Sequence, residues 1–126
     1  MINCDAALFQ SSCQMGIGFL IRDHDGRCLL ALNERVQNVT QPELAEAVAI
    51  RRALSLAKEE GYQKVIISSD CLSAIQRIIS PLLDRSRIGC LISDIKRIGA
   101  EFSECTFMHV NRLCNLATHT LARLSE

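Results

Sequence analysis

The sequence contains no tryptophan, a single tyrosine, and no excess of charge of either sign. Its 14 Lys and Arg residues balance its 14 Asp and Glu residues, so the chain has no overall positive field that would attract a polyanion. Because aromatic side chains are so scarce, stacking of nucleic-acid bases on them is excluded as a main mode of binding. No apolar run is long enough for a membrane-spanning helix, and no charged start followed by an apolar block forms a signal peptide. We therefore expect no membrane partner.

The cysteines form no recognisable framework. There are seven of them, an odd number, and no two are spaced as a C-x-x-C pair, which argues against a structural zinc site. Most lie in apolar segments, as small buried hydrophobic residues do. We expect reduced thiols, no disulfide partner and an intracellular location, with nucleus and cytoplasm unresolved. A secreted domain built on disulfides is the alternative.

The length and composition predict one domain over residues 1–126. A chain of 126 residues with 48% hydrophobic content buries a core without metal or disulfide staples. No repeat, linker or low-complexity segment divides it. The predicted strands are Ile2–Phe9, Met15–Arg22, Arg27–Arg35, Lys64–Ser69 and Ser103–Val110. Four helices are predicted. The first begins within Thr40–Glu43 and ends at Glu60, the second runs from Asp70 to Ser80, and the others span Arg87–Glu101 and Leu113–Leu124.

Local signals support this order of elements. The Asp25-Gly26 pair favours a hairpin turn, so the chain opens with an antiparallel meander. Pro42 and Glu43 are typical of a helix start, and Gly61 is typical of the residue after a helix end. Helices between the third, fourth and fifth strands imply crossover connections. The pattern predicts an α/β fold, a mixed sheet with helices packed on it.

Three carboxylates lie in apolar surroundings. Asp5 is in the middle of the first strand, and Asp70 ends the fourth strand. Glu46 heads the apolar stripe that continues along its helix to Ala57, so its carboxylate is expected to point towards the sheet. The ordinary alternatives are an edge-strand acid for Asp5, a solvated first-turn acid for Glu46 and a helix N-cap for Asp70.

Together the three acids point to a metal site. Carboxylates that converge repel one another, so such a site favours hard divalent cations. Two such ions about 3.5–4 Å apart stabilise both the attacking and the leaving oxygen of a phosphodiester. Water then serves as the nucleophile, and no serine, cysteine or lysine is needed.

Five segments in order resemble ribonuclease H domains, most closely the plant reverse-transcriptase-like subset related to retroelements. The segments are Asn3–Ala7, Gly16–Gly26, Ala45–Ile50, Ser68–Cys71 and Asn115–Ala122. The resemblance covers essentially the whole chain. It implies a ribonuclease H-like fold with a five-stranded mixed sheet, three strands antiparallel and two parallel, flanked by helices.

The resemblance also implies an activity. Ribonucleases H cleave the RNA strand of RNA–DNA hybrids with two Mg²⁺ ions, through in-line attack of water. Asp5, Glu46 and Asp70 match the first three ligand positions, and His119 stands at the fourth, where well-studied members carry an acid. Because imidazole is neutral and softer than carboxylate, Mn²⁺ is the second candidate cofactor. The four residues are both the catalytic and the metal-ligating candidates.

Other differences concern substrate binding. The loop Asn111–Cys114 is shorter than the His-bearing loop of many active members, so His109 is expected to be structural. Arg112 is the best candidate for a phosphate contact, because this short loop is expected beside the site. Gln10 and Asn115 are candidates for contacts to sugar hydroxyls. The basic protrusion with which many relatives bind the hybrid is not evident.

Several functions remain open. The first is the hybrid ribonuclease, and the second is a catalytically weak or inactive module of the same fold that binds nucleic acid or a protein. A 3′-to-5′ exonuclease of the same superfamily fits the spacing and the antiparallel opening less well. An ATP-binding domain requires glycine-rich phosphate loops that the chain lacks. The first motif lies very near Met1, so it also stays open that the chain is a piece of a longer polypeptide.

Overall fold

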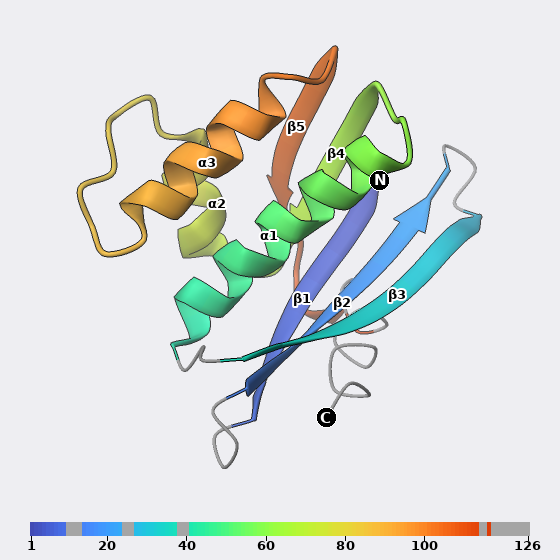
Figure 1. Ribbon diagram of the computed structural model, residues 1–126, viewed down its shortest axis with the longest axis horizontal. Helices are drawn as coiled ribbons and strands as arrows, with labels where there is room; N and C mark the ends of the chain where they lie inside the picture. The colour runs from blue at the N-terminus through green and yellow to red at the C-terminus, as the bar shows by residue number, and fades with distance from the viewer. Residues whose placement is uncertain (10–13, 24–26, 38–40, 114–115, 117–126) are drawn as a thin grey trace.

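The computed structural model describes residues 1–9, 14–23, 27–37, 41–113 and 116, and Figure 1 shows the arrangement of their helices and strands. The strands are β1 (Ile2–Phe9), β2 (Gln14–Arg22), β3 (Cys28–Gln37), β4 (Lys64–Ser69) and β5 (Glu104–His109). The helices are α1 (Pro42–Glu59), α2 (Leu72–Ile79) and α3 (Gly89–Gly99). This order matches the predicted one as far as β5, and most of the predicted last helix, Leu113–Leu124, lies outside the described residues.

The five strands form one mixed sheet in the order β3-β2-β1-β4-β5. β1 pairs antiparallel with β2, and β2 pairs antiparallel with β3. β4 runs parallel to both β1 and β5. The predicted fold class, three antiparallel strands plus two parallel ones, is confirmed.

β2 is an interior strand because its residues are apolar or small on both sides. The alternating side chains of Met15, Ile17, Phe19 and Ile21 belong to the core beneath the helices. Gly16 and Gly18, on the other side of the strand, are buried as well. Asp23 lies at the hairpin end, where its carboxylate accepts a hydrogen bond from the Arg27 amide at 2.9 Å. The third strand is longer than predicted and reaches Gln37.

α1 begins and ends as its sequence predicts. Gln41 is the N-cap, Pro42 is the first helical residue, and Gly61 follows the helix end with φ of 81°, a left-handed conformation that glycine adopts without strain. The face towards the sheet is rich in small residues, and Ala45, Ala49 and Ala53 are fully or almost fully buried. Small side chains let the helix axis come close to the strands.

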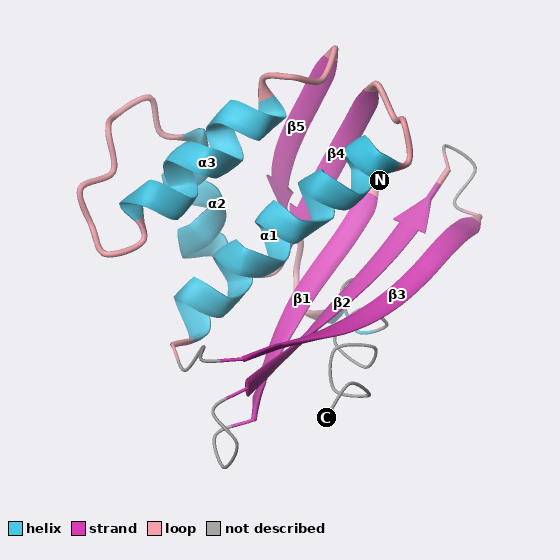
Figure 2. Cartoon of the chain, viewed as in Figure 1, coloured by secondary structure: helices cyan, strands magenta, loops and turns pink. Residues whose placement is uncertain are grey.

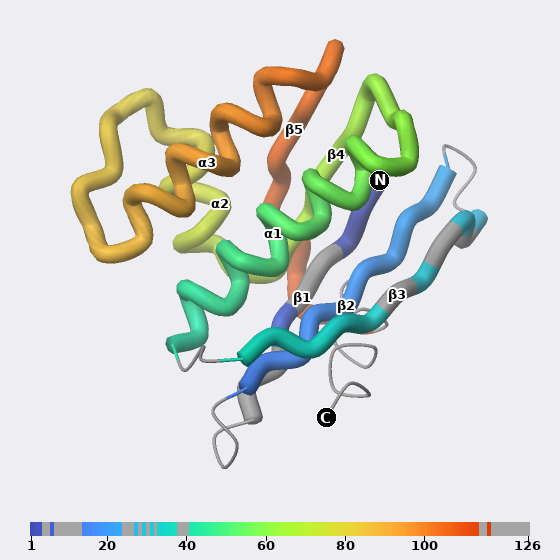
Figure 3. The backbone as a smooth tube through the Cα atoms, in the orientation of Figure 1, coloured from blue at the N-terminus to red at the C-terminus, as the bar shows by residue number. Residues whose placement is uncertain are grey.

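The described helices and the sheet share one core. α1 packs across β1, and α3 packs against α1 (Figure 1). Figure 2 shows α1 in front of the sheet and α2 and α3 to the left of β5, and Figure 3 shows β3 curving towards the start of α1. No helix in the described part of the chain is long and apolar enough to cross a membrane.

Two expectations need correction. α2 begins at Leu72 with Cys71 as its N-cap, so Asp70 precedes the helix and does not begin it. Cysteine burial is also less general than predicted, because Cys90 is exposed on α3 and Cys71 and Cys105 are only partly buried. These three cysteines are free thiols.

The core assignment predicts a contrast between two isoleucines. Ile95 on α3 is fully buried, whereas Ile79 on α2 is 60% exposed. Ile95→Ala is expected to lower the free energy of unfolding by about 2–5 kcal/mol, because it leaves a cavity. Ile79→Ala is expected to change it by less than about 0.5 kcal/mol. Urea unfolding measures both, and equal losses would contradict the assignment.

Candidate active site

β1 and β4 pair in parallel close to two of the predicted acids. Ile2 lies opposite Ile67 and Asn3 opposite Ser68. Asp5 follows this contact by two residues on β1, and Asp70 follows it by two residues on the other chain segment, just past the end of β4. Because adjacent strands lie about 4.8 Å apart, the same register extended by two residues would set Asp5 opposite Asp70. For Asp5 only the backbone is described, and it pairs with Gly18 of β2.

Asp70 lies in the turn between β4 and α2, and 15% of its side chain is exposed. Sheets with parallel strands commonly place their ligand sites at the carboxyl ends of those strands. The Ser69 hydroxyl accepts a hydrogen bond from the Cys71 amide at 3.1 Å, which shapes the turn. The Asp70 carboxylate is therefore sheltered, at a position where α/β folds build sites.

Glu46 lies near the start of α1, which packs across β1. Its flanking residues Ala45 and Ala47 are buried, and its own side chain is partly buried with Oε2 shielded from solvent. The apolar stripe predicted from Ala49 to Ala57 is buried. The ordinary alternative, a first-turn acid fully exposed to water, does not fit this position.

Arg112 lies beside Asp70, with its Nε atom 4.0 Å from Oδ2. The guanidinium side chain is 80% exposed, so it is accessible to a ligand that approaches Asp70 from solvent. His109 stands in register with Ser69 at the end of β5, and the Val110 amide donates to the Ser69 carbonyl at 3.0 Å. The end of β5 is thereby joined to the Asp70 turn, but the His109 side chain itself is exposed.

The remaining predicted site residues cannot be placed. Gln10, Asn115 and His119 lie outside the described residues. In the part of the chain that the structure describes, no three His, Cys, Asp or Glu side chains form a metal-binding group. Glu46 and Asp70 nevertheless provide sheltered carboxylate oxygens, the donor type that Mg²⁺ and other hard divalent cations prefer. The donor chemistry fits a divalent cation that would also draw on Asp5 and His119.

An apolar hollow among the described residues lies elsewhere. It has a volume of about 430 Å³ and is lined by Ile2, Ile21, Tyr62, Val65 and other residues at the opposite end of β1 and β4. Apolar hollows are common ligand sites. Its lining lacks Asp5, Glu46 and Asp70, so we place the chemistry at the acids and not at the hollow.

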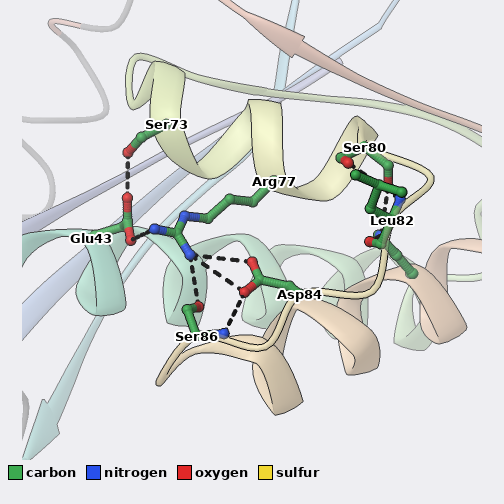
Figure 4. A network of polar contacts seen from close by, with 8 residues as sticks. Glu43, Ser73, Arg77, Ser80, Leu82, Asp84 and Ser86 are labelled. Atoms are coloured by element: carbon green, nitrogen blue, oxygen red, sulfur yellow. Dashed lines mark hydrogen bonds and ion pairs between the residues drawn. The ribbon is translucent and has the colours of Figure 1, made fainter.

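A network of polar side chains flanks the site, and the sequence analysis did not anticipate it. We call Glu43, Ser73, Arg77, Asp84 and Ser86 the Arg77 network; Figure 4 shows Arg77 between Glu43 on one side and Asp84 and Ser86 on the other. The guanidinium lies 3.3 Å from Glu43 and 3.2 Å from Asp84, and it donates to the Ser86 hydroxyl at 2.7 Å. The Ser73 hydroxyl donates to Glu43 at 2.6 Å.

One signal for this network was present in the sequence. Ser73 and Arg77 are four residues apart on α2, so they share a helix face. By its local pattern, Glu43 is only an acid that favours the positive end of α1. Its two partners come from residues 30 or more positions away, and local patterns do not identify such pairs.

A comparison with protein families gives one match over nearly the whole chain. A family described as reverse transcriptase-like matches residues 3–125. No curated protein sequence matches the chain. Affiliation with plant members of that family stays a prediction.

Solved structures share the fold. Ribonuclease H1 from the archaeon Halobacterium salinarum has a TM-score of 0.88 and 17% identity, over 98% of this chain and 94% of that one. LC11 ribonuclease H1 in complex with an RNA/DNA hybrid has a TM-score of 0.84 and 20% identity, over 98% and 94%. The foamy viral protease-reverse transcriptase, also in complex with an RNA/DNA hybrid, has a TM-score of 0.78 and 12% identity, over 98% of this chain and 19% of that one. At these identities the similarity establishes the fold.

The Arg77 network predicts a dependence of stability on pH. Hydrogen bonds from Ser86, with a smaller contribution from Arg77, hold the pKa of Asp84 below its usual range. A lowered folded-state pKa stabilises the fold above the unfolded-state pKa, and this contribution is lost as the pH falls through the folded-state value. Asp84→Asn is therefore expected to be less stable than wild type at pH 7, with the difference shrinking in acid. Urea unfolding from pH 7 to pH 3 tests this, and a constant difference would contradict it.

Proposed function

Because the chain belongs to the reverse transcriptase-like family, we propose that it is a divalent-metal-dependent ribonuclease that hydrolyses the RNA strand of RNA–DNA hybrids. The observation that carries the proposal is the parallel β1–β4 register, which pairs Asn3 with Ser68 and which, extended by two residues, would set Asp5 opposite Asp70. The fold is that of ribonucleases H, and two structures of this fold, of LC11 ribonuclease H1 and of the viral reverse transcriptase, contain an RNA/DNA hybrid. This chain matches 19% of the viral protein, so we also propose that it can be a domain of a longer polypeptide.

The roles of the acids follow from their positions. Asp5 and Asp70, on neighbouring backbones, would hold divalent cations together with Glu46 from α1. Two Mg²⁺ ions, when bound, would neutralise charge on the attacking and leaving oxygens of the phosphodiester. His119 would complete the ligand set through a ring nitrogen, which favours Mn²⁺ more than an acid at that position does. The partial burial of Glu46 and Asp70 keeps competing water from their oxygens.

Substrate binding would depend on groups around the acids. Arg112 is exposed beside Asp70 and would contact a phosphate next to the scissile one. Gln10 and Asn115 would hydrogen-bond sugar hydroxyls, which distinguish RNA from DNA. The balanced charge of the chain implies that these local contacts, and not a general basic field, determine affinity.

The first test is cleavage of an end-labelled RNA–DNA hybrid in Mg²⁺ and in Mn²⁺. Asp70→Asn is expected to lower cleavage by at least about 100-fold, the scale on which lost transition-state stabilisation lowers kcat. Circular dichroism and thermal unfolding check that the variant folds, and single-stranded RNA and duplex DNA serve as substrate controls. Cleavage that survives in a folded Asp70→Asn variant would refute the assigned site. A folded wild-type protein that cuts nothing in either metal would instead favour the nucleic-acid-binding or protein-binding module.

A second test separates binding from chemistry. Arg112→Ala is expected to raise KM for the hybrid and to leave kcat nearly unchanged, because a phosphate contact outside the reacting group contributes equally before and during the reaction. Steady-state kinetics at several salt concentrations measures both constants. A loss confined to kcat would contradict a binding role for Arg112.

A further inference from the structure

The start of α1 is held by another helix and not by its own cap. Gln41, the N-cap residue, makes no side-chain capping hydrogen bond. Glu43 in the first turn is bound instead by two residues of α2: Ser73 at 2.6 Å and Arg77 at 3.3 Å. A local N-cap side chain is a common way to stabilise the first turn of a helix. Here the α1 start is tied to α2, and its orientation depends on that helix.

These two contacts join the elements next to the two described acids of the candidate site. Glu43 is three residues, about one turn, before Glu46 on α1. Ser73 is three residues after Asp70, in the first turn of α2. The Glu43–Ser73 hydrogen bond and the Glu43–Arg77 ion pair therefore link the turn before Glu46 to the helix that directly follows Asp70.

Arg77 is itself held from its other side. Its guanidinium contacts both Asp84 and Ser86, and the Ser86 amide donates to Asp84 at 2.8 Å (Figure 4). The segment that carries them is joined to α3, because Lys96 donates to the Ser80 carbonyl at 2.7 Å. The Asp84 carbonyl also lies so close to Gly89 that a Cβ there would clash with it. Arg77 thus contacts both α1 and a segment that is packed against α3.

We propose that Arg77 is a positioning residue that sets the separation of Glu46 and Asp70 and thereby the affinity of the site for divalent cations. This inference rests on the proposed function. It identifies a residue that does not bind the cation but positions the residues that do. Metal ligands must be held within about 0.5 Å of their productive geometry. Glu46 is on α1 and Asp70 directly precedes α2. A contact between these helices is therefore required to keep the two carboxylates at the separation that binds a cation.

Arg52 provides a matched control. Its side chain is 36% exposed, the same fraction as that of Arg77. It also starts from a helix and pairs with a carboxylate in another element, Glu34 of β3, at 2.9 Å. This ion pair lies away from α2 and from the Asp70 turn. Arg52→Met and Arg77→Met therefore remove similar ion pairs. Only the Arg77 pair joins α1, which carries Glu46, to the helix that follows Asp70.

The experiment measures Mn²⁺ binding to the whole chain by titration calorimetry, without nucleic acid, and stability by urea unfolding. Arg77→Met is expected to raise the Kd for Mn²⁺ by about 10-fold or more, as loss of a group supporting metal ligands does. Arg52→Met is expected to lower stability to a similar extent and to leave the Kd unchanged. Ser73→Ala, which removes only the hydrogen bond to Glu43, is the milder variant and is expected to weaken binding in the same direction.

The outcomes separate this proposal from the function on which it rests. If Arg77→Met and Ser73→Ala bind Mn²⁺ as wild type does, or weaken binding no more than Arg52→Met, positioning by Arg77 is refuted while the ribonuclease proposal stands. If folded wild type binds no Mn²⁺ and cuts no hybrid, both are refuted. Should Arg77→Met fail to fold, Ser73→Ala decides the question alone.

Discussion

The short parallel contact between β1 and β4 joins the two halves of this molecule. On one side are the antiparallel strands β1, β2 and β3, and on the other the parallel pair β4 and β5. The contact pairs Ile2 with Ile67 and Asn3 with Ser68, and the Ser68 hydroxyl donates a hydrogen bond to the Ile2 carbonyl at 3.5 Å. Asn3 and Ser68 are both buried. A shift of one residue here would turn every side chain of one strand to the other face, and it would separate Asp5 from Asp70.

α1 depends on the same junction. Because its buried face consists largely of alanine, the helix packs closely across β1 and brings Glu46 towards the strand that carries Asp5. Partial burial of an acid in this way costs free energy unless a cation or a hydrogen-bond donor compensates it. The fold therefore places the acids on or next to regular elements, a central strand and a long helix. The exposed Arg112 lies at the edge of the candidate site, beside Asp70.

Much of this fold was predictable because its elements follow strong local patterns. Alternating apolar residues identify β2, Pro42 and Gly61 mark the limits of α1, and Val and Ile identify β4. The errors fall at element boundaries. Asp is a residue type common at helix N-caps, but α2 starts at Leu72, two residues after Asp70. The turn between them is shaped by the Ser69 hydroxyl and by the hydrogen bond from the Val110 amide to the Ser69 carbonyl. The Val110 contact depends on β5, which begins about 35 residues after the end of β4.

The sequence by itself determined the order of strands and helices, the buried face of α1 with Glu46 at its head, and the set of acids on which a metal site could be built. It did so because helix and strand periodicity record which side of each element is apolar. Only the tertiary structure decided that β1 pairs with β4 in parallel, that Arg112 lies beside Asp70, and that Glu43 pairs with Arg77. Such contacts join residues far apart in the chain. They follow from strand order and helix packing, which no local pattern encodes.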